Sequence, residues 1–351
     1  MKGRPVGALI ALSMCAFAFV TTETLPIGLL LPISEDLDVS PFQVGLLVTS
    51  YGLVVVLATI PLTRLTGRIP RRFLLAGLVT VYVVSTGVTA AASGYGVLLT
   101  ARLVTALSQA LFWALAIPTA SALFPTRIRG RVISVVMAGT SLAAVLGVPT
   151  GTWLGEQVGW RTPFLVLSGI GLVAALAIVA LVPTEAPDEA SSARGSAPDA
   201  RRYRLLLVLS ALAVTGAFAS FTYVTSFLVT VSGFAAAATG ALLLARGVAG
   251  IGGVFAGGVL VDRDPWVATL APVLLQAVAL LGLFTLGTVP VAAVVLVALA
   301  GTAFSALTTV LGSRILQVAP GRTDLAAAGI STSINVGITV GALAGGLLLP
   351  I

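Results

Sequence analysis

Three ionisable side chains interrupt long apolar stretches of the chain: Glu23, Arg102 and Arg246. A charge at the centre of a bilayer costs about 2.5–3.5 kcal/mol on insertion scales, so such a residue normally faces a cavity or a partner. We expect Glu23 to carry a proton and Arg102 to set its affinity, because burial and a nearby guanidinium act in opposite senses on the protonation of a carboxyl group. A structural ion pair is the alternative. For Arg246, a substrate contact and a structural role both stay open.

Polar and aromatic residues accompany these charges at helical spacing. Thr105, Gln109 and Trp113 follow Arg102 at offsets of three, seven and eleven, which places all four on one face of a helix. This face suits either a polar cavity, with the indole stacked on a bound molecule, or ordinary helix packing. Since small-molecule sites need a few placed polar and aromatic groups, the other candidates for the cavity are Tyr51, Phe221, Tyr223 and Asn335.

Several kinds of chemistry are excluded by residues that the sequence lacks. It contains no histidine and a single cysteine, Cys15, so it predicts no metal site and no disulfide framework. It has no Gly-x-x-x-x-Gly-Lys loop for a nucleotide, and no span carries paired carboxylates or a nucleophile with a base. We therefore expect a protein that is not an enzyme and that needs no cofactor.

The elements that must position these residues are membrane-spanning helices. Hydrophobic residues make up 58% of the chain and charged residues 9%, whereas soluble domains carry about 25% charged residues. A span needs about 20 apolar residues. This rule predicts six spans and then five, at approximately 6–32, 43–63, 73–92, 97–120, 132–154, 162–183, 204–231, 236–261, 266–286, 291–311 and 326–350.

The pattern predicts an all-α membrane protein of two related helical bundles. Residues 1–183 form the first bundle, the polar segment 184–203 a cytoplasmic linker, and 204–351 a second bundle that is incomplete because a twelfth helix is missing. The sequence Ala16-Phe17-Ala18 matches Ala217-Phe218-Ala219, an offset of about 201 that pairs Glu23 with Val224. Parallel repeats of this kind are a known transporter architecture.

Small residues recur at every fourth position in two of the spans. One stripe surrounds Pro149, which lacks a backbone N–H and interrupts the helical hydrogen bonds. Such stripes let helices pack closely, and we expect them to lie between the halves, with ordinary packing as the alternative. The glycines are Gly139, Gly147, Gly151 and Gly155 in the first stripe, and Gly337, Gly341 and Gly345 in the second.

Arginine and lysine residues gather in alternate loops, which sets the orientation because cytoplasmic loops carry the excess. The opposite side has Arg161, predicted to lie away from the acidic residues Glu35, Asp36 and Asp38. The scattered charges do not form the clustered footprint of a nucleic-acid binder. We expect a multi-pass monomer in the cytoplasmic (inner) membrane with a cytoplasmic N-terminus. The basic residues on that side are Lys2, Arg4, Arg64, Arg68, Arg71, Arg72, Arg127, Arg129, Arg131, Arg194, Arg201, Arg202, Arg204, Arg263, Arg314 and Arg322.

At several motifs the chain resembles the major facilitator superfamily, in particular its proton-driven efflux branch. The loop signature Gly-x-Leu-x-Asp-Arg of that family is met by Gly258, Leu260, Asp262 and Arg263, and its first-half copy survives at Leu65, Arg68, Arg71 and Arg72. The segment 147–151 resembles the Gly-Pro element of antiporters. Segments 21–30, 112–113 and 139–161 look most like the sugar-efflux branch.

This resemblance implies a secondary transporter that exports a sugar or drug-like molecule in exchange for protons. It also implies a gating role for Arg68, Asp262 and Arg263. Two alternatives stay open: a non-transporting sensor built on a transporter fold, which the missing Asp at Gly67 favours, and a facilitator without proton coupling. The expected partners are a small-molecule substrate, protons and the lipid bilayer.

The alternation of basic loops makes a direct prediction about topology. A reporter enzyme fused near Ala193 should be active in the cytoplasm, and one fused near Asp36 should be active outside. Labelling of the two fusions in the opposite sense would reverse the orientation of the chain.

Overall fold

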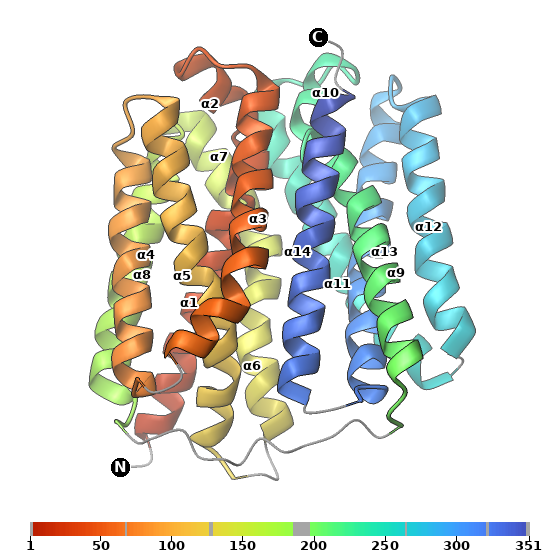
Figure 1. Ribbon diagram of the computed structural model, residues 1–351. Helices are drawn as coiled ribbons and strands as arrows, with labels where there is room; N and C mark the ends of the chain where they lie inside the picture. Colours follow the sequence, from red (N-terminus) through yellow and green to blue (C-terminus); the bar gives the residue numbers. More distant parts are fainter. Residues whose placement is uncertain are drawn as a thin grey trace.

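The computed structural model describes residues 3–66, 69–125, 129–184, 197–263, 265–320 and 323–348. Every regular element in these residues is a helix, and eleven stretches of them are long and apolar enough to cross a membrane. The predicted all-α fold with six and then five spans is confirmed. Figure 1 shows the helices running roughly side by side between two faces of the molecule, one with the N-terminus and the other with α2 and α10.

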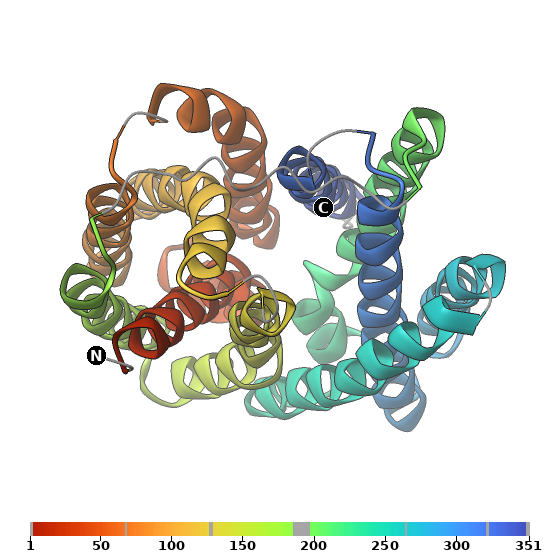
Figure 2. The ribbon, with the colours of Figure 1, turned by 90° about the horizontal axis from the view of Figure 1, so that it is seen from below.

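Seen end-on, the helices of the two halves form two neighbouring groups (Figure 2). The first half contains α1 (Gly3–Gly28), α2 (Leu30–Asp36), α3 (Pro41–Thr66), α4 (Arg71–Ala90), α5 (Tyr95–Ala122), α6 (Arg129–Leu142), α7 (Val148–Val158) and α8 (Arg161–Leu181). The second half contains α9 (Ala200–Phe221), α10 (Val224–Thr230), α11 (Thr239–Arg263), α12 (Pro265–Leu286), α13 (Pro290–Gln317) and α14 (Thr323–Leu347).

The outer surface of the bundles is apolar. Large side chains such as Leu57, Leu176, Leu212 and Phe284 are exposed, the last of them by 88%. Water would not solvate such a surface, whereas hydrocarbon does, and the helices satisfy their backbone hydrogen bonds internally as a bilayer requires.

The predicted linker 184–203 is shorter than expected at its end, because α9 begins at Ala200. The Asp199 side chain accepts hydrogen bonds from the backbone N–H groups of Arg201 and Arg202, at 2.9 and 3.0 Å. An aspartate that caps the first turn in this way stabilises a helix start. Residues 185–196 of the linker lie outside the described residues.

The first helix of each half breaks at a corresponding place. Leu29, between α1 and α2, has φ −101° and ψ 18°, and Tyr223, before α10, has φ −113° and ψ 14°. The predicted continuous spans 6–32 and 204–231 are therefore each two helices. The two break residues are 194 positions apart in the sequence.

Glycine packing gives the same repeat offset. Gly147 lies against Thr21 and Gly341 against Thr215, and both the glycines and their partners are separated by 194 positions. The predicted offset of about 201 is wrong. It differs by seven residues, about two helical turns, so the mistaken match kept residues on the same helix face.

The corrected register changes the residue that corresponds to Glu23. At an offset of 194 this residue is Ala217, not Val224. The acidic side chain is still absent from the second half at the equivalent position.

The glycine stripes pack within the halves, not between them as expected. Gly151 and its stripe lie against α1, next to Leu25, and Gly345 and its stripe lie against α9, next to Ala219. The first stripe contains a π-helical turn at Ala143–Gly147 immediately before Pro149, which accommodates the missing N–H of the proline.

The halves meet through other residues, toward the face that carries α2 and α10. Thr225 of α10 donates a hydrogen bond from its hydroxyl to the carbonyl oxygen of Ile27 in α1, at 2.8 Å. Gly240 at the start of α11 lies beside Pro149 and Trp153 of α7. Apolar side chains of both halves also pack together, as Ile27, Val48 and Val148 do with Phe218. Within the described residues, the two bundles are thus joined by main-chain approach, apolar packing and the buried hydrogen bond of Thr225.

The glycine packing predicts a large effect of a single methyl group. A Cβ at position 341 would lie 2.5 Å from the carbonyl oxygen of Thr215, which is backbone and cannot rotate away. We expect Gly341→Ala to destabilise the protein by about 1–3 kcal/mol through overpacking, measured as a lower midpoint of thermal unfolding. Gly216→Ala is the matched control, because a Cβ there meets nothing within 4 Å. Equal stability of the two variants would contradict this packing.

Candidate substrate and proton site

Glu23 is buried in α1, where the bundle brings it to Gln109 of α5. Its Oε2 accepts a hydrogen bond from Gln109 Nε2 at 2.7 Å. The other amide atom, Gln109 Oε1, accepts from the Tyr51 hydroxyl of α3 at 2.8 Å. Three predicted site residues thus form one chain of hydrogen bonds that links α1, α3 and α5.

Arg102 lies beside this chain and is fully buried. It donates from Nη1 to the carbonyl oxygen of Thr22, at 2.9 Å, and from Nη2 to that of Glu23, at 3.0 Å. The Thr22 carbonyl would normally accept from the N–H four residues later, but that residue is Pro26, which has none. The guanidinium replaces the missing donor. Its carbon also lies 5.0 Å from the centre of the Tyr51 ring.

These contacts give Arg102 a position other than the structural ion pair that was the alternative to a proton-coupling role. Its hydrogen bonds go to main-chain carbonyls of α1, while the Glu23 carboxylate is bound by the neutral amide of Gln109. Arg102 therefore fixes the helix that carries Glu23 and adds a positive charge near it.

Two residues of the predicted stripe on α5 do not join the site. The Thr105 hydroxyl is 2.8 Å from the hydroxyl of Ser85 on α4. Trp113 lies in an apolar cluster, with its ring 5.2 Å from that of Phe112. The side of α5 that holds Gln109 is the side that faces α1 and α3.

In the second half, Arg246 of α11 lies over the ring of Phe221, with 3.9 Å from the guanidinium carbon to the ring centre. Phe304 is the second ring beside it, at 5.9 Å. Arg246 and Phe221 line a small cavity, and Gln276 of α12 lines it too. Gln276 was not predicted, because an uncharged residue in an apolar span gives a weak signal.

The remaining candidates lie at contacts between the halves. The Tyr223 hydroxyl donates to the carbonyl oxygen of Ala342 at 3.1 Å, and its ring packs with first-half residues of an apolar cluster. Asn335 donates from Nδ2 to the carbonyl oxygen of Ser331, at 2.9 Å. Its buried Oδ1 has no hydrogen-bond partner within the described part of the chain. Its backbone lies beside Gly52 of α3.

The predicted gating residues are only partly described. Arg68 lies outside the described residues. Asp262 and Arg263 form the end of α11, and their side chains are not described.

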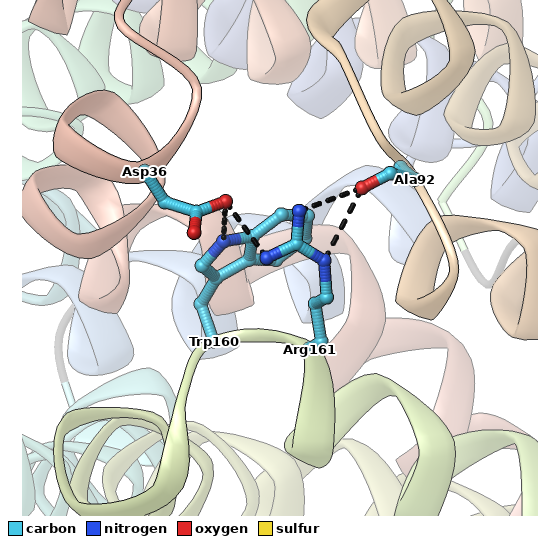
Figure 3. A network of polar contacts seen from close by, with 4 residues as sticks. All are labelled: Asp36, Ala92, Trp160 and Arg161. Atoms are coloured by element: carbon cyan, nitrogen blue, oxygen red, sulfur yellow. Dashed lines mark hydrogen bonds and ion pairs between the residues drawn. The ribbon is translucent and has the colours of Figure 1, made fainter.

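Figure 3 shows a polar cluster on the α2 face that the sequence did not predict. Arg161 at the start of α8 pairs with Asp36 at 2.7 Å, and its Nη2 donates to the carbonyl oxygen of Ala92 at 2.7 Å. Trp160 Nε1 donates to the same Asp36 oxygen at 3.1 Å. The prediction that Arg161 lies away from the acidic residues is wrong. The cluster ties α2 to the α4–α5 turn and to α8.

The Trp160 hydrogen bond has the largest effect on the pKa of Asp36 and lowers it below the ordinary value of 3.8; burial opposes this effect, and the hydrogen bond and charge of Arg161 lower the pKa further. A lowered pKa stabilises the fold at pH values above the ordinary pKa of the group. This stabilisation is lost as the pH falls through the folded-state pKa.

Two bundles of membrane-spanning helices around buried polar groups define a membrane transporter fold, and the chain belongs to the Major Facilitator Superfamily, which matches residues 12–342. It is 33% identical over 357 residues to the uncharacterized MFS-type transporter YtbD of Bacillus subtilis, covering 98% of this chain and 88% of that protein. It is 31% identical to a probable sugar efflux transporter of Helicobacter acinonychis, covering 96% and 87%.

A similar relative is the probable sugar efflux transporter of Mannheimia succiniciproducens, 32% identical, covering 96% of this chain and 85% of that protein. Among solved structures, the fold is similar to a bacterial homologue of the human lysosomal transporter Spinster in an inward-facing, unoccupied conformation. The TM-score is 0.79 at 18% identity, covering 98% of this chain and 82% of the other.

The Asp36 cluster predicts a pH-dependent contribution to stability. We expect Asp36→Asn to lower the thermal midpoint slightly at neutral pH, because exposed ion pairs contribute about 0.2–1 kcal/mol. The difference from the parent should shrink as the pH falls below the ordinary value of 3.8 and vanish once the pH lies below the lowered folded-state pKa, where the parent carboxyl group is also protonated. Glu35→Gln, an exposed neighbour, is the control. A difference that persists unchanged at low pH would show that the charge of Asp36 is not responsible.

Proposed function

We propose that this transporter exports a small molecule, a sugar or a drug-like compound, in exchange for protons across the cytoplasmic membrane. In this proposal the N-terminus is cytoplasmic, the α2 face is external and the protein acts as a monomer. The similarity to proteins named as probable sugar efflux transporters supports the substrate class. The arrangement of Glu23 supports the coupling to protons.

The supporting observation is that Glu23 can change charge without disturbing its neighbours. Its partner is a neutral amide, so protonation leaves no buried guanidinium unpaired. Arg102 keeps its two carbonyl partners in either state. A carboxyl group held in this way can exchange a proton while α1 and α5 stay packed.

The coupling cycle follows from this arrangement. Glu23 takes up a proton when the site opens to the outside and substrate leaves. It releases the proton when the site opens to the cytoplasm, before the next substrate binds. Tyr51, Gln109 and Asn335 offer hydroxyl and amide groups to a polar substrate: Tyr51 and Gln109 lie where α3 meets α5, and Asn335 lies where α14 meets α3.

The test replaces the titratable group with its neutral isostere. We expect Glu23→Gln to abolish transport driven by a pH gradient in proteoliposomes, while exchange of radiolabelled monosaccharide at equal concentrations on both sides persists. The measurement is uptake of the radiolabelled monosaccharide, driven by the pH gradient, into proteoliposomes in which the protein is oriented inside-out.

Glu35→Gln serves as the matched control, because it removes one exposed carboxylate on the same side of the protein. Gradient-driven transport by Glu23→Gln at the parental rate and with the parental pH profile would refute the coupling role. Absence of any transport by the parent, together with binding of sugar, would favour the sensor.

A further inference from the structure

The second half contains a site that corresponds to the Glu23 site by the internal repeat. The offset is 194 between α1 and α9 and between α7 and α14, and 195 between α3 and α11 and between α5 and α13, where Arg246 follows Tyr51 and Phe304 follows Gln109 by 195 positions. The contact between Tyr51 and Gln109 in α3 and α5 corresponds to the contact between Arg246 and Phe304 in α11 and α13. The remaining correspondences are Ala217 for Glu23 and Val297 for Arg102.

Small side chains leave space at this second site. Ala217 and Val297 stand where the first half has Glu23 and Arg102, and both line a cavity of about 10 Å³ together with Arg246 and Gln276. A volume of this size holds roughly one water-sized group. The space is therefore suited to a single oxygen of a ligand.

Two polar groups border this space. Within the described residues, the Arg246 guanidinium pairs with no carboxylate and the Gln276 side-chain oxygen accepts no hydrogen bond. The ion pairs among the described residues belong to Arg161 and Arg202, and Arg246 contacts the rings of Phe221 and Phe304. Aromatic faces hold a guanidinium without neutralising it. Gln276 is 7% exposed, and its buried Oε1 has no hydrogen-bond partner among the residues that the structure describes.

The site lies where the two halves meet. Phe221 and Phe304 belong to an apolar cluster that also includes Ile27, Val48 and Val148 of the first half. The second site therefore borders the first half through this apolar cluster.

We propose, on the basis of the transport function proposed above, that Arg246 binds an oxyanion of the substrate and that the transported molecule is an acidic sugar. The guanidinium fork binds carboxylate or phosphate oxygens with two N–H groups. A hydroxyl next to the anion donates to Gln276 Oε1. The guanidinium and the Gln276 oxygen together distinguish an acidic sugar from a neutral one, which would leave the partly buried cation without a counterion.

The first measurement is equilibrium binding to the purified full-length chain in lipid nanodiscs, without any gradient. D-glucuronate, D-glucose 6-phosphate and D-glucose are compared as competitors of radiolabelled D-glucuronate. We expect at least one of the two anions to bind about tenfold or more tightly than glucose, as hydrogen bonds to charged groups imply. The stronger anion identifies the source of the oxyanion. Equal affinities for all three sugars, or binding of none of them, would overturn the proposal.

Variants of the site assign the effect to Arg246. Arg246→Gln should weaken binding of the preferred anion about tenfold or more and leave glucose unchanged, while Arg246→Lys keeps part of the affinity. Ala217→Glu should have the same effect as Arg246→Gln, because it places a carboxylate beside the guanidinium. Arg204→Gln, an exposed residue at the start of α9, is the control for net charge.

The variants also separate this proposal from the transport function. If Arg246→Gln does not fold, Ala217→Glu and Arg246→Lys still decide the outcome. Anion binding at the parental strength in Ala217→Glu and Arg246→Gln would refute the site. Since binding needs no gradient, loss of proton-driven transport alone leaves the oxyanion site standing, and failure of the oxyanion site leaves export of a neutral sugar possible.

Discussion

The candidate site depends on one missing hydrogen-bond donor. Pro26 leaves the carbonyl of Thr22 without its helical partner, and an unpaired buried carbonyl costs about 1–3 kcal/mol. Arg102 supplies the donor from α5, so the defect in α1 becomes the point where two helices are joined. Because the two Nη groups of the guanidinium are directed to main-chain carbonyls, Glu23 is left to a neutral amide. The freedom to change charge that we propose for Glu23 follows from the position of a proline three residues later.

The two halves repeat their backbone packing and differ in their chemistry. Glycines 194 positions apart let α7 approach α1 and α14 approach α9 in the same way. The side chains that face the centre do not repeat: an acid and an arginine in the first half correspond to Ala217 and Val297, and a tyrosine corresponds to Arg246. Main-chain approach therefore sets the scaffold, while a few side chains decide what each half can bind.

Much of the fold was predictable because its signals are local. Apolar length identified the spans, and the cost of burying charge singled out Glu23, Arg102 and Arg246. Register was not predictable, since a shift of two helical turns preserves the same face. Small-residue stripes showed that helices pack closely but not which helix is the partner. Contacts between distant residues, such as Arg161 with Asp36, leave no pattern in a single sequence, and Trp113 could not be assigned to a cavity or to apolar packing from its spacing alone.

The division of charge between the halves has a consequence for energetics. In the proposed cycle Glu23 of the first half carries the proton, and Arg246 of the second half is a cation that pairs with no carboxylate among the described residues. Export of a neutral sugar against one proton moves one positive charge inward. Export of a singly charged acidic sugar against the same proton moves the equivalent of two, because an anion leaves as the proton enters. Each elementary charge that crosses 100 mV contributes about 2.3 kcal/mol. In a cell with a negative interior, Arg246 would thus let the membrane potential act twice on each transport cycle, and an acidic substrate would be expelled with a larger driving force than a neutral one.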